Sequence, residues 1–487
     1  MPAIAEVRLV SAESLYEEGT FVEGLIASAA SGIDANAAGG YVGRIRQGTA
    51  NFILTTERFV GAVDRDASLT SLVSEGNFDG LSRNEMFTAK IGPNGSVINS
   101  GQASNSQADN IDVVWVDDAL LASEGTPTGI PNSGGFTSFT AMQIAEDGIP
   151  IFRASYGSDG EAIFAGLGNT LIRTGDTLGI PGNAVTDLTN SDAATDGQSF
   201  GSIVTDTFGG SGDRALVVNN AIVARESDVI GLANGGSSAA ETFDSFANVR
   251  VNPAGDVLYS ATSSDDDWIA VFNGQVIHRE GAEQDGLELI ATSNIGLGLN
   301  ADGDHAVTYQ NGLFLNGELL SGIDLGVPIT DLTAPGIETF QGSLDISDRY
   351  TVEDQTFVDL FFFARKESFT SNDSAILRVT AEIILDTLPG LVGDYNDSGI
   401  VEQNDLNLVL TNWGQVAPFE PNGDPFATPI VDQEELNRVL TNWGNSNTPP
   451  NLAGLPVPEP AAGLALLALA GLARVGRRAT KPLGQTA

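Results

Sequence analysis

Cysteine is absent from this chain of 487 residues. Disulfide bonds, thiolate nucleophiles and cysteine-ligated metal sites are therefore excluded. A chain of this length buries enough surface to fold without covalent cross-links, so the absence is compatible with an exported protein. It does not by itself decide the compartment.

Basic residues are scarce. The chain has 22 Lys and Arg against 64 Asp and Glu, a formal net charge of −42, and its lysines are Lys90, Lys366 and Lys481. A field of this sign repels phosphate backbones, so we expect no nucleic-acid partner. Most of the acids are expected to solvate the surface, where they favour solubility and loose capture of divalent cations.

Motifs of common enzymes are missing as well. The sequence contains no His-Glu-x-x-His pair and no phosphate-binding glycine loop with a following lysine. Its two histidines, His278 and His305, each fall within a predicted strand. We therefore predict that the chain is not an enzyme. Paired carboxylates for glycoside hydrolysis remain the alternative, because 64 acids supply many pairs.

A hairpin-like unit recurs along the body of the chain. Each copy has an apolar strand, a two-residue polar turn, a second apolar pair and an acidic or glycine stop. The turns suit the positive-φ positions of a type I′ hairpin, and measured from the second turn residue their spacing is 51, 51, 54 and 43. The turn pairs are Asp117-Asp118, Gly168-Asn169, Asn219-Asn220, Asn273-Gly274 and Asn316-Gly317.

A second element precedes several of these hairpins, namely a turn glycine followed by an alternating strand, as at 148–154 and 255–261. With the apolar stretch upstream, each period holds about four strands, the content of one propeller blade. We predict a mainly β fold with a propeller-like β-repeat domain of six or seven blades at 35–385. The N-terminal segment, 1–34, begins with an alternating pattern that suits a closing strand. A pair of β-sandwiches is the alternative, and the regular period argues against it.

Two acidic runs in the body, Asp265-Asp266-Asp267 and Asn300-x-Asp302-Gly303-Asp304, carry oxygen donors that could hold calcium. Both runs sit where a β-turn is expected. We prefer the turn interpretation for both.

Two short helices are predicted near the C-terminus, where segments 406–414 and 436–444 read LNLVLTNWG and LNRVLTNWG. The apolar residues of the first fall on one helical face: Leu406, Val409, Leu410 and Trp413. The second repeats them as Leu436, Val439, Leu440 and Trp443. Neither short helix can bury its stripe alone, so we expect the two faces to pack together.

An EF-hand-like loop stands before the first helix. Its oxygen donors alternate as in a calcium loop, and Gly399 occupies the position of the sharp turn. The predicted calcium ligands are Asp394, Asn396, Ser398, Ile400 through its backbone carbonyl, Glu402 and Asp405. A polar turn with a helix cap is the alternative interpretation.

The second loop departs from this pattern, because Phe426 stands at a ligand position and Pro429 replaces the turn glycine. The remaining candidate ligands are Asp424, Thr428, Asp432 and Glu435. Since two positions are compromised, we expect a weak second calcium site or none.

The duplicated loop and helix over 393–444 resemble a type I dockerin module, in which Asp405 rather than Glu closes the first loop. The resemblance implies a small α-helical pair stabilised by calcium, with a cohesin-like module as partner. Because the second loop is degraded, we favour the role of a structural clip.

The C-terminal segment, 457–480, combines a short motif, an apolar run at 461–473 and a basic cluster. The motif is Val457, Pro458, Glu459 and Pro460, and the basic residues are Arg474, Arg477 and Arg478. The segment follows an Asn/Pro-rich linker at 445–456 and resembles a PEP-CTERM sorting signal. The resemblance implies a short transmembrane helix before processing and an exosortase-type sorting machinery as partner. The arginines would remain on the cytoplasmic side.

Residues 1–15 show no basic region followed by an apolar run, so no secretory signal peptide is visible and we expect the true start to lie upstream. The chain as a whole is predicted to be exported, and to be membrane-anchored, on the cell surface or extracellular. The body loosely resembles tandem-repeat choice-of-anchor proteins, a resemblance that implies no activity. We predict a non-enzymatic surface or matrix protein that binds protein or polysaccharide. The alternative is a secreted carbohydrate-active enzyme, a polysaccharide hydrolase or lyase, that carries a dockerin.

Overall fold

The structure divides the chain into two compact units, one of Ala5–Leu385 and one of Met1–Ile4 with Asp386–Ala487. This computed structural model describes residues 6–17, 21–22, 25–26, 29–36, 39–47, 50–55, 59–63, 82–104, 111–117, 119–158, 160–178, 184–206, 214–284, 286–291, 295–322, 337–352, 355–366, 374–384, 403–412, 436 and 439–440.

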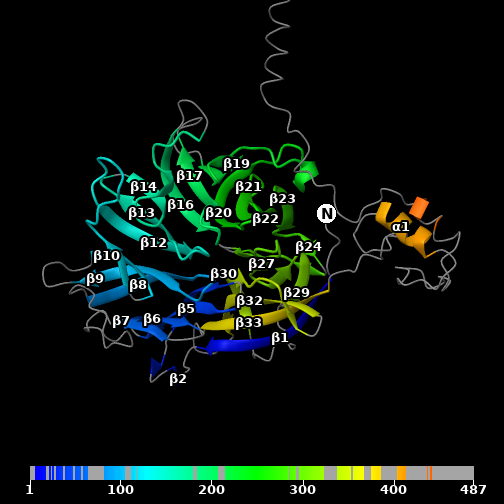
Figure 1. The fold of residues 1–487 in the computed structure, drawn as a ribbon, viewed down its shortest axis with the longest axis horizontal. Helices are drawn as coiled ribbons and strands as arrows, with labels where there is room; N and C mark the ends of the chain where they lie inside the picture. The colour runs from blue at the N-terminus through cyan, green and yellow to red at the C-terminus, as the bar shows by residue number, and fades with distance from the viewer. Residues whose placement is uncertain are drawn as a thin grey trace, which may run out of the picture. The chain divides into compact units, whose positions relative to one another are not determined.

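The larger unit is built from antiparallel β-sheets (Figure 1). Among the described residues, six sheets have four strands each, and hydrogen-bonded neighbours within each sheet are also neighbours in sequence. These sheets are β4 (Ala29–Ala35), β5 (Tyr41–Gln47), β6 (Ala50–Thr55) and β7 (Phe59–Val63); β8 (Ser82–Ile91), β9 (Val97–Ser104), β10 (Ile111–Val116) and β11 (Ala119–Ser123); β12 (Phe136–Ile144), β13 (Pro150–Tyr156), β14 (Gly160–Ala165) and β15 (Thr170–Arg173); β16 (Val185–Ala193), β17 (Phe200–Asp206), β18 (Arg214–Val218) and β19 (Ala221–Arg225); β20 (Phe243–Val251), β21 (Val257–Ser263), β22 (Trp268–Phe272) and β23 (Gln275–Arg279); and β26 (Gly296–Leu299), β27 (His305–Tyr309), β28 (Gly312–Leu315) and β29 (Glu318–Gly322). The prediction of a mainly β repeat body is confirmed.

A further sheet joins the two ends of the body. It contains β30 (Ile337–Ile346), β32 (Gln355–Lys366) and β33 (Ser374–Ile384), with the short β31 (Tyr350–Val352) beside β32. Strand β1 (Glu6–Glu17) forms its outer edge and runs antiparallel to β33, from Glu6 opposite Ile384 to Glu17 opposite Ala375. The first and last strands of the body therefore share one sheet. The remaining described elements here are β2 (Phe21–Val22) paired with β3 (Leu25–Ile26), β24 (Glu283–Gln284) paired with β25 (Leu287–Glu288), and the 3-10 turn η1 (Leu232–Asn234).

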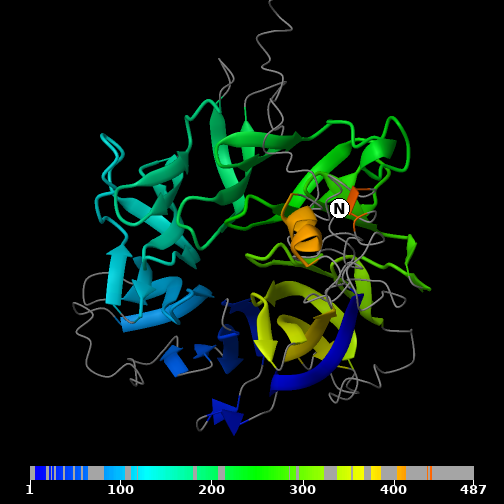
Figure 2. The same ribbon diagram turned by 45° about the vertical axis from the view of Figure 1, so that its right-hand side comes forward.

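The first strands of the sheets follow one another around a common centre. In chain order β4, β8, β12, β16, β20, β26 and β30 each contact the next, and β30 contacts β4. Figure 2 shows the sheets arranged in this order, from blue through green to yellow. The cycle is closed, so residues far apart in sequence meet at its centre.

The middle strands are buried on both faces. Five consecutive residues at the start of β21 are buried, from Val257 to Ala261. Tyr259 packs into an apolar cluster shared with the sheet that begins at β16, whereas Leu258 packs into the cluster shared with the sheet that begins at β26. Neighbouring sheets therefore cover both sides of β21, which explains why residues on both of its faces are buried.

Three hairpin turns have the predicted positive φ at both turn residues, namely Asn219-Asn220, Asn273-Gly274 and Asn316-Gly317, whereas Gly168-Asn169 has it only at Gly168. Asp117, Asn219, Asn273 and Asn316 have φ of 46°, 49°, 49° and 52°, and Gly168 has φ of 88°. The side chains of these turns also support the second strand of their sheet: Asn273 Oδ1 accepts a hydrogen bond from the Val257 amide at 2.9 Å. Asn316 and the His305 amide repeat this contact at 3.0 Å. The asparagine thus serves both the positive φ and the strand pairing.

In the smaller unit, α1 (Gln403–Thr411) overlaps the first predicted helix but begins three residues earlier, and Leu436, Val439 and Leu440 are helical in the second. Val409 and Val439 are fully buried. Leu410 and Leu440 were expected on the same faces, yet they are 53% and 55% exposed. The buried face of each helical segment is therefore narrower than the apolar spacing predicted. In both copies the valine is buried and the leucine that follows it is exposed.

Candidate functional site

The strongest candidate site in the larger unit is a cavity of about 80 Å³ at the centre of the cycle of first strands. Residues from all seven of the first strands and the turns after them line it. It is large enough for a few water molecules or a small ligand, since one water needs roughly 10–15 Å³.

Strand register explains which side chains reach this cavity. The penultimate residue of each first strand stands at the same place in its sheet: Asp34, Lys90, Gln143, Asp192, Arg250, Gly298 and Asp345. All except Gly298 line the cavity. At Gly298 a Cβ would lie 3.2 Å from Ile346 Cγ2, so glycine permits the close approach of β30 there. The centre is therefore assembled from one position repeated around the cycle.

Asparagines in the turns after the first strands connect neighbouring sheets. Asn252 Nδ2 donates to the Asn300 carbonyl at 2.9 Å, and Asn300 Nδ2 donates to the Ser347 carbonyl at 2.9 Å. Asn36 Nδ2 bridges in the same way to the Gly92 carbonyl at 3.0 Å. These buried amides are satisfied across the sheet boundaries, and they hold the rim of the cavity.

The charged groups of the cavity are mutually engaged. Lys90 Nζ lies 2.5 Å from Asp34 Oδ1, and Asp34 Oδ2 accepts the Ile91 amide at 2.7 Å. On the other side, Arg250 Nη1 lies 3.6 Å from Asp192 Oδ1, and the Val251 amide donates to Asp192 Oδ2 at 3.1 Å.

The third carboxylate, Asp345, accepts backbone amides of Ile346 at 2.9 Å and Ala35 at 3.2 Å. The Ala35 contact crosses from the last sheet to the first. Each of the three carboxylates therefore accepts at least one backbone amide, and two also face a cation.

Burial controls the protonation of this group. Burial raises the pKa of Asp34 well above its usual range, and the nearby Asp345 carboxyl adds to that rise while Lys90 opposes it. Burial also raises the pKa of Asp192, against the opposing charge of Arg250. Burial alone would lower the pKa of Lys90, but the surrounding carboxylates, Asp34 above all, raise it. The two cations therefore stay charged, while the buried acids are easier to protonate than exposed ones.

The described lining of the cavity lacks the aromatic side chain that a sugar-processing site offers to a sugar ring. Among the described residues that line it, none is aromatic. Its carboxylates are committed to Lys90, Arg250 and backbone amides. The arrangement is suited to holding the sheets together and to admitting a small polar ligand or water.

The two acidic runs considered as calcium sites are turns with other partners. Asp266 has φ of 65°, and Asp267 Oδ2 lies 2.9 Å from Arg279 Nη1. Asp304 accepts two hydrogen bonds from Arg349, at 2.6 and 2.7 Å. Within the part of the chain that the structure describes, no group of three or more His, Cys, Asp or Glu is placed to hold a metal ion.

The site residues predicted from sequence lie almost entirely outside the described residues. This applies to Asp394, Asn396, Ser398, Ile400 and Glu402 of the first loop, to the whole second loop, and to the motif and arginines of the sorting segment. Asp405 lies within α1, and its side chain is not among those described. In the described part of the chain no helix is long and apolar enough to cross a membrane.

The charged residues of the central cavity were not predicted as a site. A signal for them exists, because each is a polar residue directly before the last apolar residue of a first strand, as in Asp34-Ala35, Lys90-Ile91 and Arg250-Val251. That signal becomes readable only once the sheets are aligned on their turns.

No protein-family model matches the chain, and no curated protein compared with it matches either. Among solved structures, similarity is found to a protein of unknown function from Bacteroides caccae, with 10% identity, a TM-score of 0.23, and coverage of 60% of this chain and 81% of that chain. A prolyl endopeptidase gives 10% identity and a TM-score of 0.27, covering 72% of this chain and 49% of that chain. Prolyl oligopeptidase B from Galerina marginata gives 11% identity and a TM-score of 0.30, covering 72% and 50%. This chain spans about half the length of the two peptidases.

Proposed function

We propose that this chain is an exported surface or matrix protein whose body is a seven-bladed β-propeller that serves binding and structure rather than catalysis. The observation that carries this proposal is the state of the central cavity. Its carboxylates are engaged by Lys90, Arg250 and backbone amides, and no aromatic side chain is among its described lining residues. A glycoside hydrolase instead needs two carboxyl groups that are free to act on a bound sugar.

Two features of the fold support the propeller. The first strands contact one another in a closed cycle, and β1 completes the sheet formed by the last strands of the body. Radial repetition of four-stranded sheets leaves only short, protected edges. Such a body exposes loops and crevices between sheets as binding surfaces.

The test of this assignment is to incubate the full chain with bacterial extracellular polysaccharides and to measure both affinity electrophoresis and new reducing ends. We expect either retardation without product or no interaction. Product formation that is abolished by Asp345→Asn would make the chain a carbohydrate-active enzyme and would refute the proposal. Asp176→Asn, at a partly exposed carboxylate outside the cavity, is the matched control.

For the smaller unit we propose a dockerin-like calcium clip. Its support is the oxygen spacing from Asp394 to Asp405 and the buried Val409 and Val439 of the two helical segments. Calorimetric titration of the full chain with calcium should reveal one strong site that is lost in Asp394→Ala and retained in Asp424→Ala. Equal binding by the wild type and Asp394→Ala would remove the first loop as the site.

For the C-terminal segment we propose processing by an exosortase-type machinery, supported by the order of motif, apolar run and arginines. In a host that carries such a machinery, mass spectrometry of the mature protein should find a C-terminus near Pro458. Replacement of Pro458 and Glu459 by alanine should leave the tail attached. An intact C-terminus in the mature wild-type protein would contradict the proposal.

A further inference from the structure

A second hollow lies away from the central cavity, in the crevice between the sheet that ends in β19 and the sheet of β20–β23. Its volume is about 330 Å³. Its apolar lining residues include Val223 of β19, Val229 and Ile230 of the connection after β19, Phe243 of β20 and Tyr259 of β21. Asp228 and Asn234 add polar groups to this lining, so the crevice combines apolar side chains with a few polar ones.

Tyr259 brings one polar group into this crevice. Its residue is only 2% exposed, and its ring packs against Phe243 and Phe246 at centroid distances of 6.1 Å each. Among the described residues, no hydrogen bond engages its hydroxyl, and burial is the main cause that raises its pKa. A hydroxyl without a protein partner in the lining of a hollow is free to hydrogen-bond to water or to a ligand.

The repeat of β12–β15, two sheets earlier in the chain, shows that the hydroxyl is not needed for packing. Phe152 occupies the same position two residues into β13, is fully buried and stacks with Phe164 at 5.4 Å. The framework therefore accepts phenylalanine at this place. The hydroxyl of Tyr259 is the difference, and Tyr259 is one of the residues that line the crevice.

The rim of the crevice is unusually apolar for an exposed surface. Val223 is 44% exposed and Val229 is 59% exposed, and Leu232 in η1, close to the lining residue Asn234, is 64% exposed. A cluster of exposed apolar side chains around a hollow is typical of a binding site.

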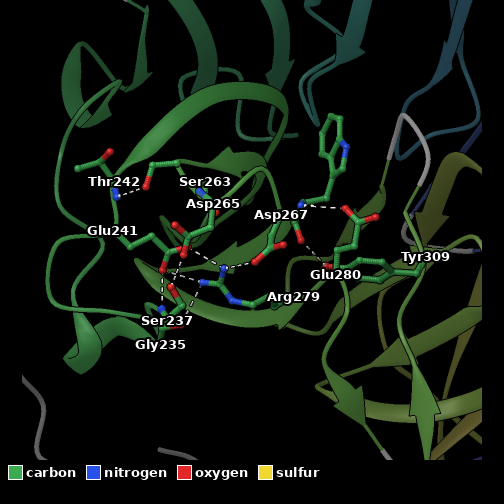
Figure 3. A network of polar contacts seen from close by, with 12 residues as sticks. Gly235, Ser237, Glu241, Thr242, Ser263, Asp265, Asp267, Arg279, Glu280 and Tyr309 are labelled. Carbon is green, nitrogen blue, oxygen red and sulfur yellow. Dashed lines mark hydrogen bonds and ion pairs between the residues drawn. The ribbon is translucent and has the colours of Figure 1, made fainter.

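The loop that carries this rim is fixed in place. Arg279 donates to both carboxylate oxygens of Glu241, at 2.7 and 2.9 Å, and also to Asp267 (Figure 3). Glu241 in turn accepts the Ser237 amide, and Gln275 holds Asn234 at 2.9 Å. The crevice is thus formed before any ligand arrives, which reduces the entropic cost of binding.

We propose that this crevice binds a small, uncharged and mostly apolar molecule that carries one hydroxyl group, which hydrogen-bonds to Tyr259. Anions are disfavoured by Asp228 in the lining and by the net charge of −42. Sugars are a poor match because each ring carries several hydroxyls and the walls offer mainly valine, isoleucine and phenylalanine. This inference stands on the crevice alone and is independent of the calcium clip and the sorting tail.

The test uses the full chain and three probes, 4-methylphenol, toluene and 4-methylbenzoate, measured by saturation-transfer NMR and calorimetry. We expect 4-methylphenol to bind, toluene to bind more weakly and 4-methylbenzoate not to bind. Tyr259→Phe should weaken 4-methylphenol by about fivefold, the equivalent of one neutral hydrogen bond, and leave toluene unchanged. Val229→Asp should abolish binding of both.

The control is Val10→Asp, which places the same charge at a valine that is 49% exposed on β1, outside this crevice. It should bind both probes as the wild type does, and thermal unfolding should verify that each variant is folded. Equal affinity of the wild type and Tyr259→Phe for 4-methylphenol overturns the proposal. So does the absence of binding at millimolar 4-methylphenol, or binding that survives Val229→Asp.

Discussion

The central cavity and the Tyr259 crevice are both hollows in the same β-sheet body, but they use their polar groups differently. At the centre, Lys90 and Asp34 face each other at 2.5 Å, and backbone amides saturate the remaining carboxylate oxygens. In the crevice, Tyr259 is buried as a residue, and its hydroxyl has no hydrogen-bond partner among the described residues. Polar groups that are hydrogen-bonded within the protein stabilise its fold, whereas a polar group without such a bond is available to a ligand.

The largest effect is expected from removing one charge of the central cavity. Lys90→Met leaves Asp34 buried without its cation, beside Asp345, and removing one partner of a buried ion pair typically costs about 3–5 kcal/mol. We expect a loss of that size in the free energy of unfolding, measured by urea titration. Arg173→Met removes an exposed ion pair with Asp176 and should change the free energy by less than about 1 kcal/mol. Similar losses in both variants would show that the central charges do not hold the cycle.

A residue exchange between equivalent positions should produce the next largest effect. Phe152→Tyr buries a hydroxyl in the fully apolar cluster around Phe136 and Phe164, and we expect a cost of about 1–3 kcal/mol. Tyr259→Phe should alter stability by less than about 0.5 kcal/mol, since its hydroxyl has no hydrogen-bond partner among the described residues.

Denaturant unfolding of both variants measures this asymmetry. If Phe152→Tyr is tolerated as well as Tyr259→Phe, the surroundings of the two positions are equivalent, and the hydroxyl of Tyr259 has no special environment.

Much of the fold could be predicted from local sequence. The paired turn residues fixed the hairpins, because Asn and Gly tolerate the positive φ that Asn273-Gly274 adopts. The apolar runs identified the middle strands. The pairing of β1 with β33 brings together residues more than 350 positions apart, and only an alternating pattern at the start of the chain pointed to it.

The candidate site was harder to predict for the same reason. Asp34, Lys90 and Asp345 are single polar residues near the ends of apolar strands. In the sequence, each of them indicates only that a strand ends there. They become a cluster only because the cycle closes between β30 and β4. Helical spacing likewise could not tell Val409 from Leu410, since which of two adjacent apolar residues is buried depends on the partner surface.

Stability as a function of pH should distinguish the centre from the loop network beside the crevice. Burial raises the pKa of Asp34 and of Asp192. Their protonation therefore stabilises the native state at low pH, and this contribution to the free energy of unfolding is lost as the pH rises through the raised pKa values. For Glu241, burial alone would raise the pKa, but hydrogen bonds from Arg279 and the Ser237 amide lower it, so its contribution is present at neutral pH and is lost in acid.

We therefore expect these groups to give maximum stability in mild acid, above the ordinary carboxyl pKa of about 4. Urea titrations between neutrality and acid pH measure the profile. Asp192→Asn should flatten the loss towards neutral pH and leave the acid side unchanged. A wild-type profile that rises steadily from acid to neutral pH would contradict the assignment of the central acids.

The smallest expected effect is a loss of stability at two equivalent turns, only one of which should also affect ligand binding. Asn273→Ala and Asn316→Ala each remove a hydrogen bond to a strand amide, at 2.9 and 3.0 Å, and should each cost about 1 kcal/mol of unfolding free energy. The neighbour of Asn273, Gly274, lines the crevice, whereas neither residue of the Asn316-Gly317 turn does. Only Asn273→Ala should therefore also weaken 4-methylphenol binding, as measured by calorimetry. A loss of binding in both variants would mean that general stability, and not the shape of the crevice, controls the affinity.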